Sequence, residues 1–166
     1  MKFRTISPLA LLFASLAWSV GSTALAHGDK AHDKPPVAIK KEQKDWGIAG
    51  DARDVVRTID IQMDDNMRFT PDRLEVERGQ TVRFRLANKG KVLHEMVLGT
   101  ATVLAEHAAL MKRFPNMEHD EPYMAHVPPG KAGEIVWTFN RAGTFDFACL
   151  IAGHFEAGMV GKIVVN

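Results

Sequence analysis

The chain has 166 residues, of which 46% are hydrophobic and 25% are charged, a composition that allows one globular domain with a sizeable core. Lysine and arginine number 21 against 20 acidic residues, so the formal charge of +1 provides no basic excess and argues against a nucleic-acid partner. A single cysteine excludes an internal disulfide framework and a four-cysteine metal site. Eight methionines and seven histidines point instead to another kind of metal chemistry.

Residues 1–26 have the pattern of a secretory signal peptide. Lys2 and Arg4 precede a short apolar run that ends in the small-x-small motif Ala24-Leu25-Ala26. The apolar run is shorter than the ~20 residues of a membrane-spanning helix, so we predict cleavage after this motif rather than an uncleaved anchor. The mature chain would then begin at His27, contain no membrane span, and work in a bacterial periplasm.

A charged segment precedes a β-rich region. Residues 27–50 contain many charges, Pro35-Pro36 and few apolar side chains, so we predict a flexible, histidine-containing arm before a domain of residues 51–166. From Val55 the hydrophobic pattern has period two, most clearly over 81–86, and turns rich in Gly, Asn and Asp separate the short extended runs. This pattern predicts an all-β fold, an antiparallel Greek-key β-sandwich.

An insertion at 101–130 breaks the strand pattern with a predicted helix and loop. Apolar residues recur at helical spacing over 102–114, with Thr102 as the cap and Pro115 as the stop. The face predicted to be buried consists of Val103, His107, Leu110, Met111 and Phe114. Four prolines between 115 and 129 predict a loop for the remainder of the insertion.

The residues with the most distinctive chemistry lie near the C-terminus. A strand is predicted to end at Cys149, and a tight, glycine-containing loop then supplies His154 and Met159. A second imidazole, His94, stands at the start of an earlier strand. Two histidines, one cysteine thiolate and a weak axial methionine are the ligands of a type 1 copper site. Imidazole suits Cu(II) and the sulfur ligands suit Cu(I), so the set serves both oxidation states.

This ligand pattern resembles that of the cupredoxins, the family of plastocyanin, azurin and the phytocyanins, over roughly residues 55–166. The resemblance implies a cupredoxin-like fold, a copper cofactor that alternates between Cu(I) and Cu(II), and the ligands His94, Cys149, His154 and Met159. Many members have Asn after the first His and Ser or Thr after the Cys, and these residues tie the two ligand segments together. Glu95 and Leu150 occupy those positions here, so we expect a looser ligand geometry and a perturbed copper site.

Other interpretations of these residues stay open. Taken alone, Cys149 is consistent with a buried core thiol, and Met159 with core packing. Zinc also accepts cysteine and histidine, so His94, Cys149 and His154 are consistent with a zinc site. A cysteine hydrolase is disfavoured because no oxyanion or triad signature surrounds the cysteine. The joint pattern favours copper.

Further soft ligands occur in the insertion and in the arm. Met-x-His occurs twice, and the candidates for a second, cuprous site are Met111, Met117, His119, Met124 and His126. The alternative is that Met111 and Met124 fill the core beneath the helix while the histidines are solvated. After cleavage His27 has a free α-amine beside its imidazole, and with His32 it forms a candidate N-terminal copper site. The alternative for this segment is a solvated tail.

Two functions are compatible with these features. The first is copper tolerance, in which a periplasmic protein binds copper ions and, as a further hypothesis, oxidises Cu(I) to the less toxic Cu(II). The resemblance extends to the bacterial periplasmic copper-tolerance cupredoxins, which share a Met/His-rich insertion before the cysteine. The second is a soluble electron carrier that serves periplasmic redox partners. The insertion and the His27 arm favour the first function, whose partner would be a redox or copper-handling protein.

Overall fold

The computed structural model describes residues 41–115, 117 and 120–166, which belong to one compact unit. The predicted signal peptide, most of the predicted arm, and the residues His27, His32 and His119 lie outside the described residues. The elements are β1 (Ile48–Ala49), a 3-10 turn (Ala52–Asp54), β2 (Val55–Asp64), β3 (Arg68–Thr70), β4 (Arg73–Val76), β5 (Thr81–Asn88), β6 (His94–Gly99), α1 (Ala101–Arg113), β7 (Met124–Val127), β8 (Ala132–Thr138), β9 (Gly143–Ala148) and β10 (Val160–Val165).

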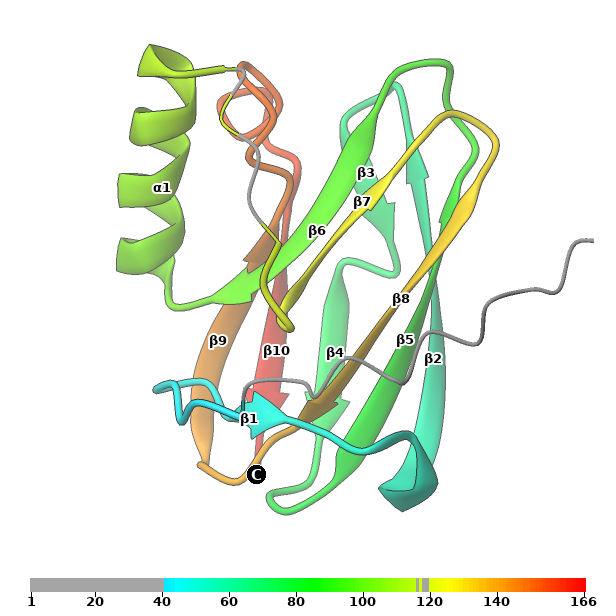
Figure 1. Cartoon of the computed structure of the whole chain (residues 1–166), viewed down its shortest axis with the longest axis vertical. Helices are drawn as coiled ribbons and strands as arrows, with labels where there is room; N and C mark the ends of the chain where they lie inside the picture. Colours follow the sequence, from blue (N-terminus) through cyan, green and yellow to red (C-terminus); the bar gives the residue numbers. More distant parts are fainter. Residues whose placement is uncertain (1–40, 116, 118–119) are drawn as a thin grey trace, which may run out of the picture. The chain divides into compact units, whose positions relative to one another are not determined.

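The strands form two five-stranded sheets that enclose a shared core (Figure 1). One sheet has the order β1-β8-β5-β2-β3 and the other has the order β4-β10-β9-β6-β7. The predicted all-β sandwich with an inserted helix is confirmed. The prediction of purely antiparallel sheets is wrong, because β2 pairs with β5 and β4 pairs with β10 in parallel. Between β3 and β4 the chain crosses to the other sheet, and this crossover lets β5 return beside β2 in the same direction.

Side-chain alternation explains which strands cover which part of the core. The inward residues of β5 are those predicted, Val82, Phe84 and Leu86. Every residue of β6 is buried, because the strand is covered on both faces. Met96 lies in the core between the sheets, whereas Val97 belongs to a second apolar cluster beneath α1. Helix α1 packs against β6 and β9 on that side (Figure 1).

Helix α1 begins one residue earlier than predicted and buries a different face. Its N-cap is Thr100 rather than Thr102, and the Thr100 hydroxyl accepts a hydrogen bond from the Val103 amide at 3.3 Å. The buried positions are Leu104, Ala108 and Met111. Of the face predicted to be buried, only Met111 is enclosed; His107 is half-buried, and the exposed members are Val103, Leu110 and Phe114. The small Ala108 lies on the buried face of the helix, which packs against the sheet. The prediction considered only large apolar side chains and therefore missed it.

The predicted loop after the helix contains a strand. Residues 124–127 form β7, which pairs antiparallel with β6. Pro122 precedes this strand, and Pro128 and Pro129 follow it, so the prolines limit the strand to its short length instead of excluding it.

The last part of the predicted arm belongs to the domain, so the boundary at residue 50 was placed too late. Trp46 is buried, and its carbonyl oxygen accepts a hydrogen bond from the Trp137 indole nitrogen at 2.8 Å. Strand β1 pairs antiparallel with β8. The prediction was based on composition, and the many charged residues around Trp46 and the two-residue strand β1 outweighed these two features.

The described part of the chain contains no helix with the length and apolar character of a membrane span.

Candidate metal centre

Three of the four predicted ligands meet at one end of the neighbouring strands β6 and β9 of the second sheet. Strands β6 and β9 are antiparallel neighbours, so His94, the first residue of β6, lies beside Cys149, which directly follows β9. His154 lies in the ligand loop, residues 150–159, which joins β9 to β10. One potential ligand atom from each of these three residues lies within 4.8 Å of the others. The fold therefore brings a thiol and two imidazoles to a single point.

The three groups are enclosed to different degrees. His94 and Cys149 are buried, and His154 is half-buried. The Cys149 Sγ lies 3.2 Å from His154 Nδ1 and accepts a hydrogen bond from the Glu95 amide at 3.4 Å. Burial raises the pKa of the Cys149 thiol to about 12. Burial, and then the neighbouring His94, lower the pKa of His154, which favours the neutral ring that binds metals.

The two ring nitrogens of His94 have different surroundings. Its Nε2 lies 3.2 Å from Asp65 Oδ1, whereas its Nδ1 is buried without a hydrogen-bond partner. Buried polar atoms normally find a partner, so the unsatisfied Nδ1 of a histidine that lies beside a thiol and a second imidazole supports a role for His94 as a metal ligand. Together with the sulfur and nitrogen donor set, this atom shows that the residues fit a copper ion.

Met159, the fourth predicted ligand, is held to the other ligands through its backbone. Its amide donates to the His154 carbonyl oxygen at 3.0 Å, and its own carbonyl oxygen accepts from the Cys149 amide at 3.1 Å. The side chain is fully buried in the same core cluster as Cys149. The structure thus links this residue to the centre, and its role as an axial ligand stays a prediction.

The first sheet anchors the ligand loop through Arg68 of β3. The Arg68 guanidinium donates to the Ala157 carbonyl oxygen at 2.9 Å and to the Met67 carbonyl oxygen at 2.7 Å. Gly158 has a φ of +87°, which side-chain-bearing residues rarely adopt, and a Cβ there would lie 3.3 Å from the guanidinium. Glycine therefore lets the loop turn closely against the arginine.

Glu95 ties the two ligand segments together, so the expectation that this tie is missing was wrong. The side chain is 1% exposed, and its Oε1 accepts a hydrogen bond from the Leu150 amide at 2.8 Å. Its Oε2 lies 2.8 Å from Nε2 of His126, the residue opposite it on β7. In this chain the tie runs from a carboxylate to a backbone amide, and the residue types alone did not reveal it.

Sequence reasoning missed two residues that support the centre. Asp65 belongs to one of the turns rich in Gly, Asn and Asp, and it stands 29 residues before His94, so no local spacing connects the two residues. His126 appeared as a candidate for the second copper site or as a solvated residue. The pairing of β6 with β7 places it against Glu95 instead, and this pairing could be found only by predicting β7.

The candidates for the second site do not all share one environment. Met111 and Met124 are buried in the apolar cluster beneath α1, where the packing alternative places them. Met117 is exposed, and His126 pairs with Glu95. His119 lies outside the described residues. The cuprous site therefore stays a prediction.

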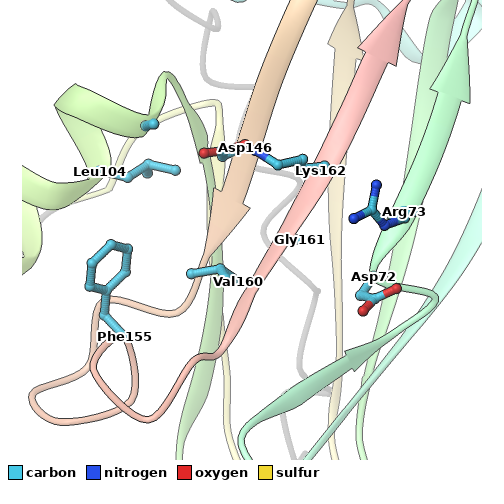
Figure 2. A pocket seen from close by; sticks show the side chains of 9 residues that line it. Asp72, Arg73, Leu104, Asp146, Phe155, Val160, Gly161 and Lys162 are labelled. Atoms are coloured by element: carbon cyan, nitrogen blue, oxygen red, sulfur yellow. Dashed lines mark hydrogen bonds and ion pairs between the residues drawn. The ribbon is translucent and has the colours of Figure 1, made fainter.

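A pocket of about 350 Å³ borders the ligand loop on the side of α1 (Figure 2). Phe155 and Val160, which line it, directly follow the predicted ligands His154 and Met159. Its polar rim includes Lys162, whose ammonium lies 3.1 Å from an Asp146 carboxylate oxygen (Figure 2). The lining contains no histidine, cysteine or methionine, so this pocket is separate from the candidate metal centre.

Comparison with known proteins agrees with this geometry. Residues 55–166 match the copper binding proteins of the plastocyanin/azurin family. The copper-resistant cuproprotein CopI of Rubrivivax gelatinosus is 46% identical over 168 residues, which cover 100% of both chains. The protein of the same name from Pseudomonas aeruginosa is 36% identical over 150 residues, covering 73% of this chain and 82% of that protein.

Solved structures show the same architecture. Auracyanin A, a "blue" copper protein from Chloroflexus aurantiacus, is 29% identical with a TM-score of 0.55, and the match covers 66% of this chain and 98% of that one. Auracyanin B is 20% identical with a TM-score of 0.59, covering 76% of this chain and 98% of the other, and this second likeness concerns the fold alone. The family match, the relatives and the convergence of the ligands lead to one conclusion: the chain belongs to the plastocyanin/azurin family of copper-binding proteins, the cupredoxins.

Proposed function

We propose that this protein binds copper at the candidate metal centre and acts in copper resistance. The observation that supports this most is the convergence of His94, Cys149 and His154, with the buried Nδ1 of His94 left without a partner. Relatives that match along the chain are named copper-resistant cuproproteins, which supports the same role here.

We assign His94, Cys149 and His154 as the equatorial ligands and Met159 as the axial ligand of a type 1 copper ion. Copper bound there supplies one-electron redox chemistry between Cu(II) and Cu(I). The protein contributes a stiff frame, because Glu95 and Arg68 hold the ligand segments through hydrogen bonds to the Leu150 amide and the Ala157 carbonyl oxygen. This frame limits movement when the charge on the ion changes. Zinc accepts the same equatorial donors, so metal analysis with optical and EPR spectra is the first measurement.

The finer proposal is that the protein converts periplasmic Cu(I), as a substrate, into Cu(II) after removal of residues 1–26. This oxidation releases one electron per copper ion, and a periplasmic one-electron redox protein would take up that electron and be reduced. His154 is the least buried of the three converging ligands, so its ring is the place where a substrate or an acceptor would approach.

A growth experiment tests the role in resistance. We expect a strain lacking the protein to become sensitive to copper, and the wild-type gene to restore growth. The Cys149→Ser variant should fail to restore it, whereas Met63→Leu, which changes a buried core methionine outside every candidate copper site, should succeed. Normal growth of the deletion strain on high copper would contradict the proposal.

An electron carrier is the second candidate function. It is favoured by Val92 and Leu93, which are 43% and 39% exposed and directly precede the ligand His94. Exposed apolar side chains next to a redox ligand suit transient docking of another protein. Normal growth on copper together with a stalled electron-transfer chain in the deletion strain would favour this function.

A further inference from the structure

We propose that Asp65 is a positioning residue of the copper centre, which holds His94 with Nδ1 free and strengthens that ring as a ligand for Cu(II). This inference rests on the proposed binding of copper by His94. It concerns what sets the preference of the centre for one oxidation state, which the ligand set alone does not decide.

The contact itself defines the tautomer of His94. Asp65 lies in the turn between β2 and β3, and its Oδ1 is 3.2 Å from His94 Nε2. An ionised carboxylate only accepts hydrogen bonds, so Nε2 must hold the ring proton. In the neutral ring, Nδ1 then has the free lone pair, and this is the nitrogen that is buried without a partner.

Backbone hydrogen bonds hold the Asp65 carboxylate in place. Its two oxygens accept from the Lys91 amide at 3.0 and 2.8 Å, and Oδ1 also lies 3.4 Å from the Val92 amide. A Cβ at Gly90 would overlap the same carboxylate, so glycine at this position is what allows the close approach. Thus the segment before His94 wraps around Asp65 and fixes both partners of the contact.

A carboxylate in this position acts on the metal through the ring. A ligand histidine that donates its second N–H to a carboxylate becomes a more basic ligand with a fixed orientation. The greater negative charge favours Cu(II) over Cu(I), because the cupric ion has the higher charge. Arg68, which holds the ligand loop, begins β3 three residues after Asp65, so the turn and the strand that follows it contact both ligand segments.

Three variants of the full-length protein test the proposal. Asp65→Asn keeps an acceptor oxygen and removes the charge, and Asp65→Ala removes both. The control is Asp60→Asn, which removes the same charge from β2, where Asp60 pairs with Arg85 at the surface. Ring-nitrogen NMR of the metal-free protein reads the His94 tautomer, and competition titrations read the Cu(II) and Cu(I) affinities.

We expect Asp65→Asn to lower the Cu(II) affinity about tenfold, within the usual 10–100-fold range for such partners, with a much smaller loss for Cu(I). The midpoint potential should then rise by about 59 mV, the one-electron equivalent of a tenfold change. In Asp65→Ala the metal-free His94 should populate both tautomers, and Asp60→Asn should match the wild type in every measurement.

Equal Cu(II)-to-Cu(I) affinity ratios in Asp65→Asn and Asp60→Asn would overturn the proposal, and this comparison holds even if the alanine variant does not fold. A single, unchanged His94 tautomer in a folded Asp65→Ala protein would overturn it as well. If the wild-type protein bound no copper, the proposed function would fail, while the metal-free tautomer measurement would still decide whether Asp65 positions His94.

Discussion

Among the regions of this molecule that contain sulfur side chains, two have very different surroundings. At the ends of β6 and β9, Cys149 lies among imidazoles, and its neighbour His94 has a ring nitrogen without a partner. Beneath α1, Met111 and Met124 lie among aliphatic side chains in a closed apolar cluster. Residue type alone does not separate these two environments, so it is an incomplete guide to metal binding in this chain. The better guide is an enclosed polar atom that the protein itself does not satisfy.

The two regions meet at consecutive residues. Cys149 belongs to the core between the sheets, and Leu150 belongs to the cluster beneath α1. The Glu95 side chain accepts a hydrogen bond from the Leu150 amide, and the Glu95 backbone amide donates a hydrogen bond to Cys149 Sγ. One residue therefore contacts both Cys149 and Leu150. The contrast can be tested by changing each region separately and measuring copper binding and stability in parallel.

The largest expected effect comes from removing the thiol. Cys149→Ser should abolish the intense thiolate-to-copper absorption and lower the Cu(II) affinity more than about 100-fold, because even the loss of an outer partner costs about 10–100-fold. Optical spectra and copper titration measure both. The matched control Met63→Leu, in the core between the sheets, should keep the colour and the affinity. An intense absorption retained by the serine variant would rule out this residue as the ligand.

The second effect concerns the residue between the two regions. Glu95→Ala leaves the Leu150 amide without this acceptor and removes the carboxylate that lies 2.8 Å from His126 Nε2, and should lower the free energy of unfolding by about 3 kcal/mol. Urea denaturation of the metal-free protein measures this. Glu134→Ala, which breaks a surface pair with Arg83, should cost less than about 1 kcal/mol. Equal losses in the two variants would show that Glu95 is not the tie.

The third effect separates packing from binding beneath α1. Met111→Ala should lower the free energy of unfolding by about 2 kcal/mol or more through the cavity it leaves, with no change in the number of copper ions bound. Met111→Leu and Met124→Leu nearly conserve volume and should change stability by less than about 1.5 kcal/mol. Loss of one copper equivalent in either leucine variant would support the predicted cuprous site instead.

The smallest effect is expected at the axial position. Met159→Leu should retain copper and fold stably, because the two side chains have similar volume. The midpoint potential should shift, because the axial ligand tunes the potential of a type 1 copper site. Voltammetry of the wild type and the variant measures the shift, and an identical potential would count against axial ligation by this residue.

Much of the fold followed from local patterns. The alternation in β5 and the strand–loop–strand pattern around Cys149 depend on neighbouring residues, so the sequence alone predicted them. The same local pattern pointed to His154 as a companion of the cysteine, whereas His94, far away in the sequence, was assigned through the resemblance to the cupredoxins. Strand β7 escaped prediction because its pairing with β6 spans the whole helix, and no local pattern in four residues reveals such a partner.

The supporting groups of the centre were harder to predict than the ligands. Asp65 and His126 act through contacts across 29 residues and across a strand pair, respectively, and their neighbours in sequence give no hint of them. Glu95 was noticed only as a departure from the family pattern. Its length lets it reach the Leu150 amide, a consequence that depends on three-dimensional distance rather than on residue class.

The packing of Trp46 and β1 against β8 determines how the protein can be shortened. A recombinant chain starting at residue 51 would lack both, leaving β8 as an outer strand with free backbone groups next to an uncovered Trp137 indole. Such strands recruit other molecules through intermolecular pairing, so we expect that truncation to aggregate. A chain starting at residue 41 keeps Trp46 and the pairing of β1 with β8, and it should remain monodisperse in size-exclusion chromatography.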